Sequence, residues 1–424
     1  MSLINTMLQM GAAVLMPMIF LLLALLVGVK IGQALKAALL IGVGFTGLGI
    51  VIQLLLDHLG PATNQIVERF GVDLTVIDTG WAVSSTIGWS SPLMIPGILL
   101  FLLINTVMFL CNLTRTVNID IFNYWIFLVV GTVLYAATDH WWLSLGIMAI
   151  LFILLLKIAD WTAPKMQAVY GVQGLSFPHM NTAPWIPLGM AVNAIINRIP
   201  GVRQLRWDAA KLNRTFGVFG EPIMIGCVLG ALIGILAGFA ATAILSLAIN
   251  VAAAMVLLPK MVEILMQGLN IVRETVQQKL RHRYPNRDIY IGMDVAVITT
   301  DPAILATGVL LIPIALLLAI VLPGNQVLPL VDLPSLIFVL PMLGAYCGKD
   351  MLRMLIAGII MVIGMLYFGT SLAPYYTEAA QLSHISLGPG IQESISLNSG
   401  ATTPLGWLAI WIGQGLDSLF SVRH

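Results

Sequence analysis

Polar residues inside otherwise apolar stretches are the first features of this chain that point to chemistry. His179 lies in SFPHMNTAP, two residues before Asn181. A neutral imidazole donates one hydrogen bond and accepts another, which matches the hydroxyls of a polyol. A helix-end histidine bonded only to backbone is the alternative. We interpret His179 and Asn181 as candidate ligands of a small polar solute.

Three carboxylates stand at breaks in apolar stretches. Glu221 precedes Pro222 in FGVFGEPIMIG, whereas Asp294 and Asp301 bracket a hydroxyl-containing stretch that ends at Thr300. A carboxylate can accept bonds from two sugar hydroxyls, and such charge-assisted bonds are strong. Each of the three could equally serve as a helix cap. We therefore carry Glu221, Asp294, Thr300 and Asp301 as candidate binding residues.

Two further pairs of residues complete the candidate set. Ser84 and Ser85 lie in the broken apolar stretch WAVSSTIGWSS, and Asp139 and His140 directly precede Trp141. Broken backbone at membrane depth is tolerated only where protein or a watery cavity surrounds it. The Asp139 turn is either part of a pocket or a solvated turn beside interfacial tryptophans.

Several other chemistries are not supported by the sequence. There is no GxxxxGK[ST] phosphate loop and no GxGxxG after a strand, and the three cysteines (Cys111, Cys227, Cys347) have neither metal nor disulfide spacing. The basic residues form short loops rather than a folded basic face, so no nucleic acid is expected. We expect no catalytic residue, no metal and no cofactor.

The elements that position these residues must cross a membrane. Of 424 residues, 59% are hydrophobic and 9% are charged, against about 25% charged in soluble domains. Apolar windows cover residues 7–28, 37–56, 92–110, 124–137, 141–156, 222–240, 243–258, 303–322, 333–346, 351–368 and 403–412. Because about 20 apolar residues cross a bilayer, we predict an all-α polytopic membrane protein with about ten to twelve membrane segments.

Charge in the loops predicts the orientation. Two loops are basic: one holds Arg198, Arg203, Arg206, Lys211 and Arg214, and the other holds Arg273, Lys279, Arg281, Arg283 and Arg287. The positive-inside rule places both in the cytoplasm. Residues 57–78 and 375–396 lack a basic excess and are placed outside.

Two stretches run in parallel along the chain. VIDTGWAVSSTIGWSSPLMIPGILLFLLIN begins at Val76, and YIGMDVAVITTDPAILATGVLLIPIALLLAI begins at Tyr290. Five full spans between them would make the second copy enter from the opposite face, as in the inverted repeats of secondary carriers. We predict a first repeat at about 7–160, a second at about 215–370, and hairpin-like segments at about 79–92, 174–190 and 291–303. Chance similarity is the alternative.

Several motifs together resemble the membrane (C) component of galactitol-type permeases of the bacterial sugar phosphotransferase system. They are IGVGFTGLGIVIQLLLDHLGPA from Ile41, VIDTGW from Val76, LTRTVNIDIFNYW from Leu113, FGVFGEPIMIG from Phe216, YIGMD from Tyr290 and PGNQVLPLVDL from Pro323. The likeness runs from about Met7 to about Tyr375 in the expected order.

The resemblance implies a homodimer in the bacterial inner membrane, with lipid around it. Each protomer would hold a scaffold domain and a mobile core domain, with the solute between paired hairpins of the core. A separate B component carrying a phosphocysteine, charged by an A component, would phosphorylate the sugar at the cytoplasmic face. This chain would then be the translocating subunit and not an enzyme on its own.

The resemblance also carries binding residues over to this chain. They are Ser84, Ser85, His179, Glu221 and Asp294, with Thr138 to His140 near the pocket. Two departures fall in that region: Thr300-Asp301 stands where a Gly-His pair is expected, and PHMNTAPW replaces a glycine- and serine-rich stretch. Another alditol, a pentose or a sugar acid therefore competes with galactitol as substrate.

Two rival functions remain open at this point. An ion-coupled secondary carrier would use inverted repeats and intramembrane carboxylates such as Asp294 and Asp301 equally well. A channel or an intramembrane hydrolase is the weaker rival, because SSTIGWSS and PHMN show no demonstrated pairing of a nucleophile with a base.

Overall fold

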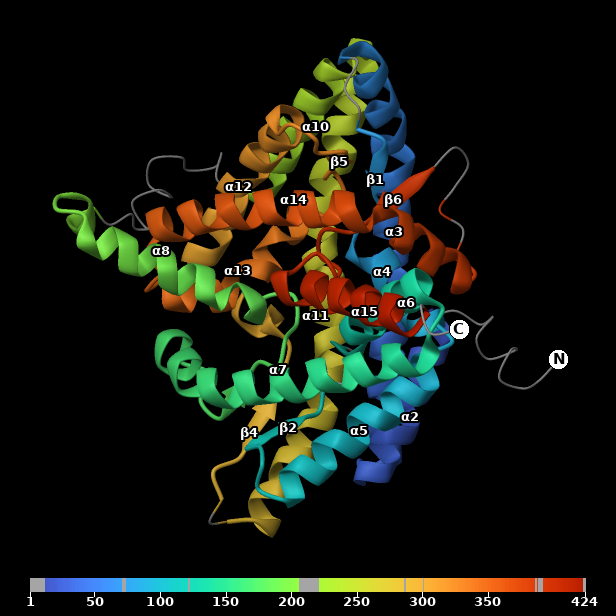
Figure 1. The fold of residues 1–424 in the computed structure, drawn as a ribbon, viewed down its shortest axis with the longest axis vertical. Helices are drawn as coiled ribbons and strands as arrows, with labels where there is room; N and C mark the ends of the chain where they lie inside the picture. Colours follow the sequence, from blue (N-terminus) through green and yellow to red (C-terminus); the bar gives the residue numbers. More distant parts are fainter. Residues whose placement is uncertain are drawn as a thin grey trace.

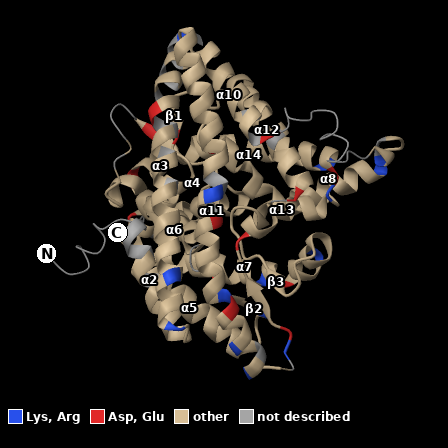
Figure 2. Ribbon diagram, turned by 180° about the vertical axis from the view of Figure 1, so that it is seen from behind, with Lys and Arg blue, Asp and Glu red and all other residues tan. Residues whose placement is uncertain are grey.

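Helices form most of the protein in the computed structural model, as the composition predicts (Figure 1). The structure describes residues 12–70, 74–120, 123–205, 221–285, 287–299, 301–385, 387 and 392–421. The prediction of an all-α polytopic membrane protein is confirmed at the level of class, with the addition of two small sheets of very short strands. Lys, Arg, Asp and Glu are sparse on a ribbon that is mostly uncharged (Figure 2).

Four helices at the beginnings of the two chain halves form one packed group: α2 (Ala12–Val27), α3 (Ile31–Phe70), α10 (Pro222–Leu236) and α11 (Ala241–Arg283). A row of glycines at four-residue spacing lets α10 approach α11. A side chain on Gly226 or Gly230 would lie 2.6 Å from the Cα atom of Ala252 or Ala248 respectively. Small residues at such contacts are how helices associate where lipid is as apolar as the side chains.

The remaining helices surround the residues of interest. They are α4 (Trp81–Ser90), α5 (Met94–Leu110), α6 (Tyr124–Thr138), α7 (Trp141–Tyr170), α8 (Ile186–Arg198), α12 (Pro302–Val321), α13 (Leu336–Tyr346), α14 (Met351–Leu382) and α15 (Pro404–Ser421). Short 3₁₀ helices lie at Ala183–Trp185 (η2), Val202–Gln204 (η3), Val295–Ile298 (η5) and Leu333–Ser335 (η6).

Length and hydropathy separate full spans from shorter helices. Within the described ranges, four helical stretches are long and apolar enough to cross a membrane: 31–51, 141–170, 302–321 and 351–382. Helices α4 and α5 bend by 92° at their junction, as a broken span or a re-entrant loop would. Shorter apolar helices cover 124–138, 226–236, 241–257 and 333–346.

Six short strands form two parallel sheets. The first sheet has the order β5 (Val327–Leu328), β1 (Val76–Asp78) and β6 (Glu393–Ile395). The second has the order β2 (Thr116–Asn118), β4 (Tyr290–Gly292) and β3 (Leu175–Ser176). The central strand of each sheet thus comes from one half of the chain and its two neighbours from the other half.

This exchange of strands accompanies a parallel order of elements. The same order of elements runs from α2 to α8 and again from α10 to α15. Each series has a helix pair, a strand, a broken helix, a second strand, two helices, a third strand and a last helix. The parallel runs farther than the predicted repeat limits of 160 and 370. The duplication itself stays a prediction.

The backbone hydrogen bonds of the two central strands follow the same pattern. The amide of Val76 donates to the backbone oxygen of Gln326, and that of Thr79 donates to the backbone oxygen of Ile395. In the other sheet Tyr290 donates to Arg115 and Met293 to Ser176, with the same three-residue spacing. Asp78 and Gly292 therefore occupy the same position in their sheets.

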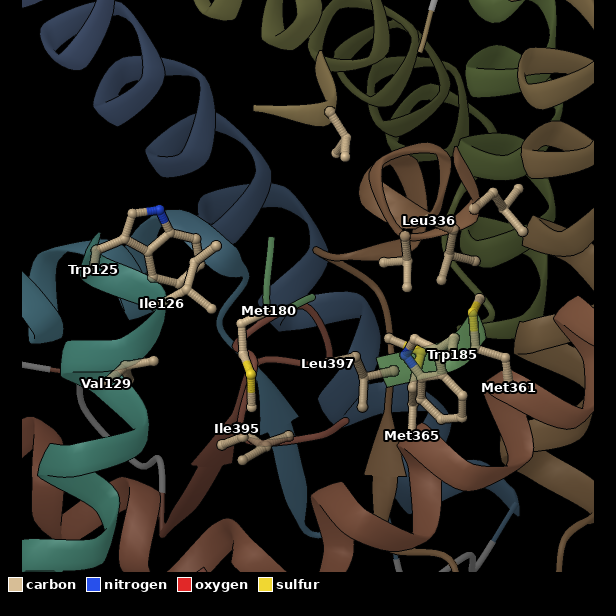
Figure 3. Close-up of a cluster of buried hydrophobic side chains, with 14 of the residues drawn as sticks. Trp125, Ile126, Val129, Met180, Trp185, Leu336, Met361, Met365, Ile395 and Leu397 are labelled. Carbon is tan, nitrogen blue, oxygen red and sulfur yellow. The ribbon is translucent and has the colours of Figure 1, made fainter. Parts of the chain in front are cut away.

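Buried apolar side chains join the two halves around these strands. Figure 3 shows Trp125, Ile126 and Val129 of α6 together with Met180, Ile395 and Leu397. On the other side of the same view Trp185 lies among Leu336, Met361 and Met365. The segments that follow β3 and β6 are therefore held inside the protein.

Candidate solute-binding site

The segments that follow strands β3 and β6 meet through two asparagines. The Nδ2 atom of Asn181 donates to the backbone oxygen of Asn398 at 3.0 Å and to its Oδ1 atom at 2.7 Å. Both side chains are buried. Because backbone that is neither helix nor sheet cannot face lipid, this contact marks a protein-enclosed polar region.

Asp332 joins the same region to the start of α4. Its Oδ1 atom accepts from the amide of Trp81 at 2.9 Å and from the Ser335 hydroxyl at 3.1 Å. Its Oδ2 atom accepts from the Ser396 hydroxyl at 2.6 Å and from the amide of Asn398 at 3.1 Å. Four donors offset the free-energy cost of burying this carboxylate. The same hydrogen bonds hold three chain segments in place relative to one another.

Asp78 closes the turn beside that carboxylate. It accepts from the amide of Gly80 at 3.1 Å and from the amide of Asp332 at 2.7 Å. Gly80 has a φ of 81°, in the region that favours glycine. This turn directs the chain from β1 into α4, so Asp78 has a structural role.

His179 and Asp294 lie together at the end of the second sheet. The Nε2 atom of His179 is 3.7 Å from Oδ1 of Asp294, and both side chains are largely buried. The same Asp294 oxygen caps η5 by accepting from the amide of Ala296 at 2.7 Å. The sequence prediction placed both residues in one site, and the structure brings them into contact.

Four polar atoms in these segments are buried and have no hydrogen-bond partner among the described residues: Ser85 Oγ, His179 Nδ1, Asn181 Oδ1 and Ser399 Oγ. An unpaired buried polar group costs on the order of 1–3 kcal/mol. Each such group in a native structure calls for an explanation, such as a bound water or a ligand. Hydroxyl groups of a solute can supply both donors and acceptors to this set.

The two adjacent serines of α4 differ in their surroundings. The Ser84 hydroxyl lies 2.5 Å from the Tyr376 hydroxyl of α14. The Ser85 hydroxyl has no hydrogen-bond partner among the described residues. Ser84 therefore ties α4 to α14, whereas the Ser85 hydroxyl is buried and unpaired within the described part of the chain.

Asp301 is engaged by protein groups on both oxygens. Oδ1 accepts from the amide of Ala303 at 3.0 Å and so caps α12, and Oδ2 forms an ion pair with Lys349. The Lys349 ammonium also lies over the ring of Tyr170, 5.4 Å from its centroid. Thr300, the neighbouring candidate, lies outside the described residues.

The other predicted residues lie at exposed positions. Asp139 and His140 form the turn between α6 and α7, where Asp139 has a φ of 54° and His140 pairs with Asp417 of α15 at 2.7 Å. Glu221 is exposed at the start of α10. The structure brings none of these three into the contacts around Asn181.

Sequence reasoning missed several buried residues, most of them in the segment after β6. They are Ser396, Asn398 and Ser399 of that segment, with Asp332 and with Tyr376 of α14. The stretch LNSGATTP from Leu397 is rich in hydroxyls and glycine and precedes an apolar helix. The same signal identified the segments at Ser84 and His179 and could have identified this one.

No metal-binding cluster is found in the part of the chain that the structure describes. No group of three or more His, Cys, Asp or Glu side chains there is placed to hold an ion. Cys111, Cys227 and Cys347 are free thiols at exposed, partly buried and buried positions respectively.

Comparison with known proteins decides the family. Residues 6–389 match the EIIC-GAT family model, described as "PTS system sugar-specific permease component". This chain belongs to that family. As an EIIC-GAT protein it is the transmembrane permease component of a sugar phosphotransferase system, in which partner components carry the phosphorylation.

Two relatives of this EIIC-GAT permease are similar over almost their whole length. The galactitol-specific EIIC component of Escherichia coli K12 is 34% identical over 406 residues, covering 96% of this chain and 89% of the relative. A putative permease IIC component of the same organism is 36% identical over 403 residues, covering 92% of both chains. The resemblance noted in the sequence is thereby confirmed.

Proposed function

We propose that this EIIC-GAT permease binds a polyol or sugar of the galactitol type in the enclosed region around Asn181 and Asn398, and translocates it by alternating access. The ligand groups are Ser85, His179, Asn181 and Asp294 from the predicted set, with Ser399 from the segment after β6. The other candidates rank lower: Glu221, Asp139 and His140 are exposed, Ser84 and Asp301 are engaged by protein groups, and Thr300 lies outside the described residues.

The observation that carries this proposal is the set of buried, unpaired polar atoms. Among the described residues, Ser85 Oγ, Ser399 Oγ, Asn181 Oδ1 and His179 Nδ1 have no hydrogen-bond partner, and the Asn181 contact with Asn398 joins two of their segments. A polyol carries one hydroxyl on almost every carbon, and each hydroxyl both donates and accepts. The Escherichia coli relative is a galactitol-specific component, which is consistent with this chemistry.

The proposal includes partners and a location. A B component with a phosphocysteine, charged by an A component, phosphorylates the solute at the cytoplasmic face of the bacterial inner membrane. The protein works as a homodimer in which α2, α3, α10 and α11 belong to the scaffold and the other helices to the moving core. Family membership supports the cooperation with other components.

Ion-coupled secondary transport is the competing function. The buried pair His179 and Asp294 could bind a proton as well as a solute, and intramembrane ionisable residues mark ion pathways as often as solute sites. Family membership weighs against this alternative.

Uptake of labelled galactitol and other hexitols and pentitols into vesicles tests the function. The assay runs with and without the A and B components and a phosphate donor. Accumulation of a phosphate ester only with the donor supports the proposal and names the substrate. Accumulation of free solute driven by an ion gradient without the donor would establish the ion-coupled alternative instead.

A further inference from the structure

Helix α4 contacts α6 through one face that carries Trp81, Ser85 and Gly88. These positions are spaced i, i+4 and i+7, so they share a side of the helix. The ring centroids of Trp81 and Trp125 are 6.3 Å apart with an interplanar angle of 34°. A side chain on Gly88 would lie 2.8 Å from the backbone oxygen of Trp125. Ser85, which lies between two residues that touch Trp125, therefore faces α6 as well.

Two polar atoms at this contact are unpaired. Ser85 Oγ and Trp125 Nε1 are buried and have no hydrogen-bond partner among the described residues, and the two residues are 2% and 3% exposed. Neighbouring hydroxyls of α4 are paired: Ser84 with Tyr376 at 2.5 Å and Thr86 with the oxygen of Ala82 at 2.9 Å. A buried indole N–H usually finds a partner. Trp89 and Trp185 also have buried indoles without a partner among the described residues, so what distinguishes Trp125 is its packing against the face of α4 that carries Ser85.

The contact adjoins the candidate site. The amide of Trp81 donates to Asp332, which also accepts from the amide of Asn398. Ile126, the residue after Trp125, lies 2.5 Å from where a side chain on Gly400 would begin, and Asn181 Oδ1 lies 3.1 Å from the same point. Figure 3 shows Trp125 and Ile126 on the side of the cluster where Met180 lies.

The chemistry of the three side chains fits a hydroxylated carbon chain. The Trp81 ring is only partly buried, so its face can pack on C–H groups. The Trp125 indole can only donate, whereas the Ser85 hydroxyl can donate and accept. A solute hydroxyl can therefore accept a hydrogen bond from the Trp125 indole N–H and form a second hydrogen bond with the Ser85 hydroxyl.

We infer that Trp81, Ser85 and Trp125 form a subsite that holds part of the carbon chain of the transported polyol and selects for a hydroxyl there. This inference rests on the proposed function and adds Trp81 and Trp125 to the binding residues.

The test is binding of labelled galactitol, then of other hexitols and pentitols, to the full-length protein in detergent. Trp125→Phe keeps a ring and removes the donor, and Ser85→Ala removes the hydroxyl. Trp185→Phe is the matched control. The Nε1 atom of Trp185 is also buried without a partner in the part of the chain that the structure describes, but its ring centroid lies 6.4 Å from that of Phe368. Figure 3 places it on the opposite side of the cluster from Trp125.

We expect Trp125→Phe and Ser85→Ala each to weaken affinity about tenfold, while Trp185→Phe binds as the native protein does. The solute-induced rise in melting temperature should shrink in the two test variants, whereas the solute-free melting temperature of Trp125→Phe should match that of Trp185→Phe. A monodeoxy analogue of the bound polyol that lacks the contacted hydroxyl should lose affinity for the native protein and not for Trp125→Phe.

Native affinity in both test variants, with binding by the unmodified protein intact, overturns the subsite and leaves the proposed function standing. If Trp125→Phe does not fold, Ser85→Ala decides the matter alone. If the unmodified protein binds no polyol or sugar, the proposed function fails and the subsite fails with it.

Discussion

Asn181 donates both hydrogens of its side-chain amide toward Asn398, to the backbone oxygen at 3.0 Å and to Oδ1 at 2.7 Å. The two residues are 217 positions apart in the chain and follow the third strand of each sheet. Through them, polar segments from both chain halves enclose one region. The predictions below test what this region and its supports do.

Asn181→Asp should weaken solute binding by roughly tenfold or more. The substitution replaces the donor with a carboxylate that faces two oxygens of Asn398, and burial of an unpaired charge is costly. Affinity for labelled polyol, measured on the purified protein, checks this. Asn250→Asp is the control, since the Asn250 amide on α11 donates to Ser246 one helical turn earlier. Equal affinity in the two variants would remove Asn181 from the site.

His179→Ala and Asp294→Asn should each reduce solute binding by about ten- to a hundredfold, because a hydrogen bond to a charged group contributes about 1.5–3 kcal/mol. The oligomeric state should match that of the unmodified protein by size-exclusion chromatography. His58→Ala and Asp57→Asn on α3, where His58 bonds to the oxygen of Leu54 at 2.8 Å, serve as matched controls. Normal binding in both site variants would show that the pocket is placed wrongly.

The Asp301 and Lys349 pair should affect stability more than binding. Lys349→Met leaves the Asp301 carboxylate without its counter-charge. The Asp301 side chain is 12% exposed and the Lys349 side chain 35%. We expect a loss of about 1–3 kcal/mol, below the 3–5 kcal/mol typical of fully buried pairs. Asp301→Asn in the same chain should restore part of it. Thermal melting of the native protein, the two single variants and the double variant measures the coupling between Asp301 and Lys349. A large drop in solute affinity in Asp301→Asn would instead support a binding role for Asp301.

Gly88→Val should lower the melting temperature, because a side chain there would lie 2.8 Å from backbone of Trp125. Forcing extra volume into a packed contact costs typically 1–3 kcal/mol. Gly146→Val on α7 is the control, as nothing lies within 4 Å of its Cβ position. A similar shift in both variants would mean that helix propensity, rather than the contact of α4 with α6, explains the effect.

Within the described residues, each predicted apolar window corresponds to a helix. The prediction of a transport function followed from these windows. The windows at 124–137 and 141–156, for example, became α6 and α7. Local pattern suffices here because a bilayer requires long apolar helices whose backbone is satisfied internally. The motifs around Val76, Phe216 and Tyr290 were likewise sufficient to identify the family, because they are local and ordered along the chain.

The composition of the site could be predicted only in part. His179 and Asp294 were identified from polarity in an apolar context, and the structure places them 3.7 Å apart. Asp332 and Asn398 escaped notice because their importance comes from partners such as Trp81 and Asn181, which are far away in sequence. Asp301 looked equally suited to a solute until Lys349 was found beside it.

The sequence by itself therefore determined the class, the family and the polar segments from which a site can be built. Only the tertiary structure decided which of these segments meet, because strands β1 and β4 each insert between two strands of the other chain half. That exchange depends on hydrogen bonds between backbones more than a hundred residues apart, and backbone hydrogen bonds carry no residue-specific signal in a single sequence. It also decided which polar groups are already paired and which remain available to a solute.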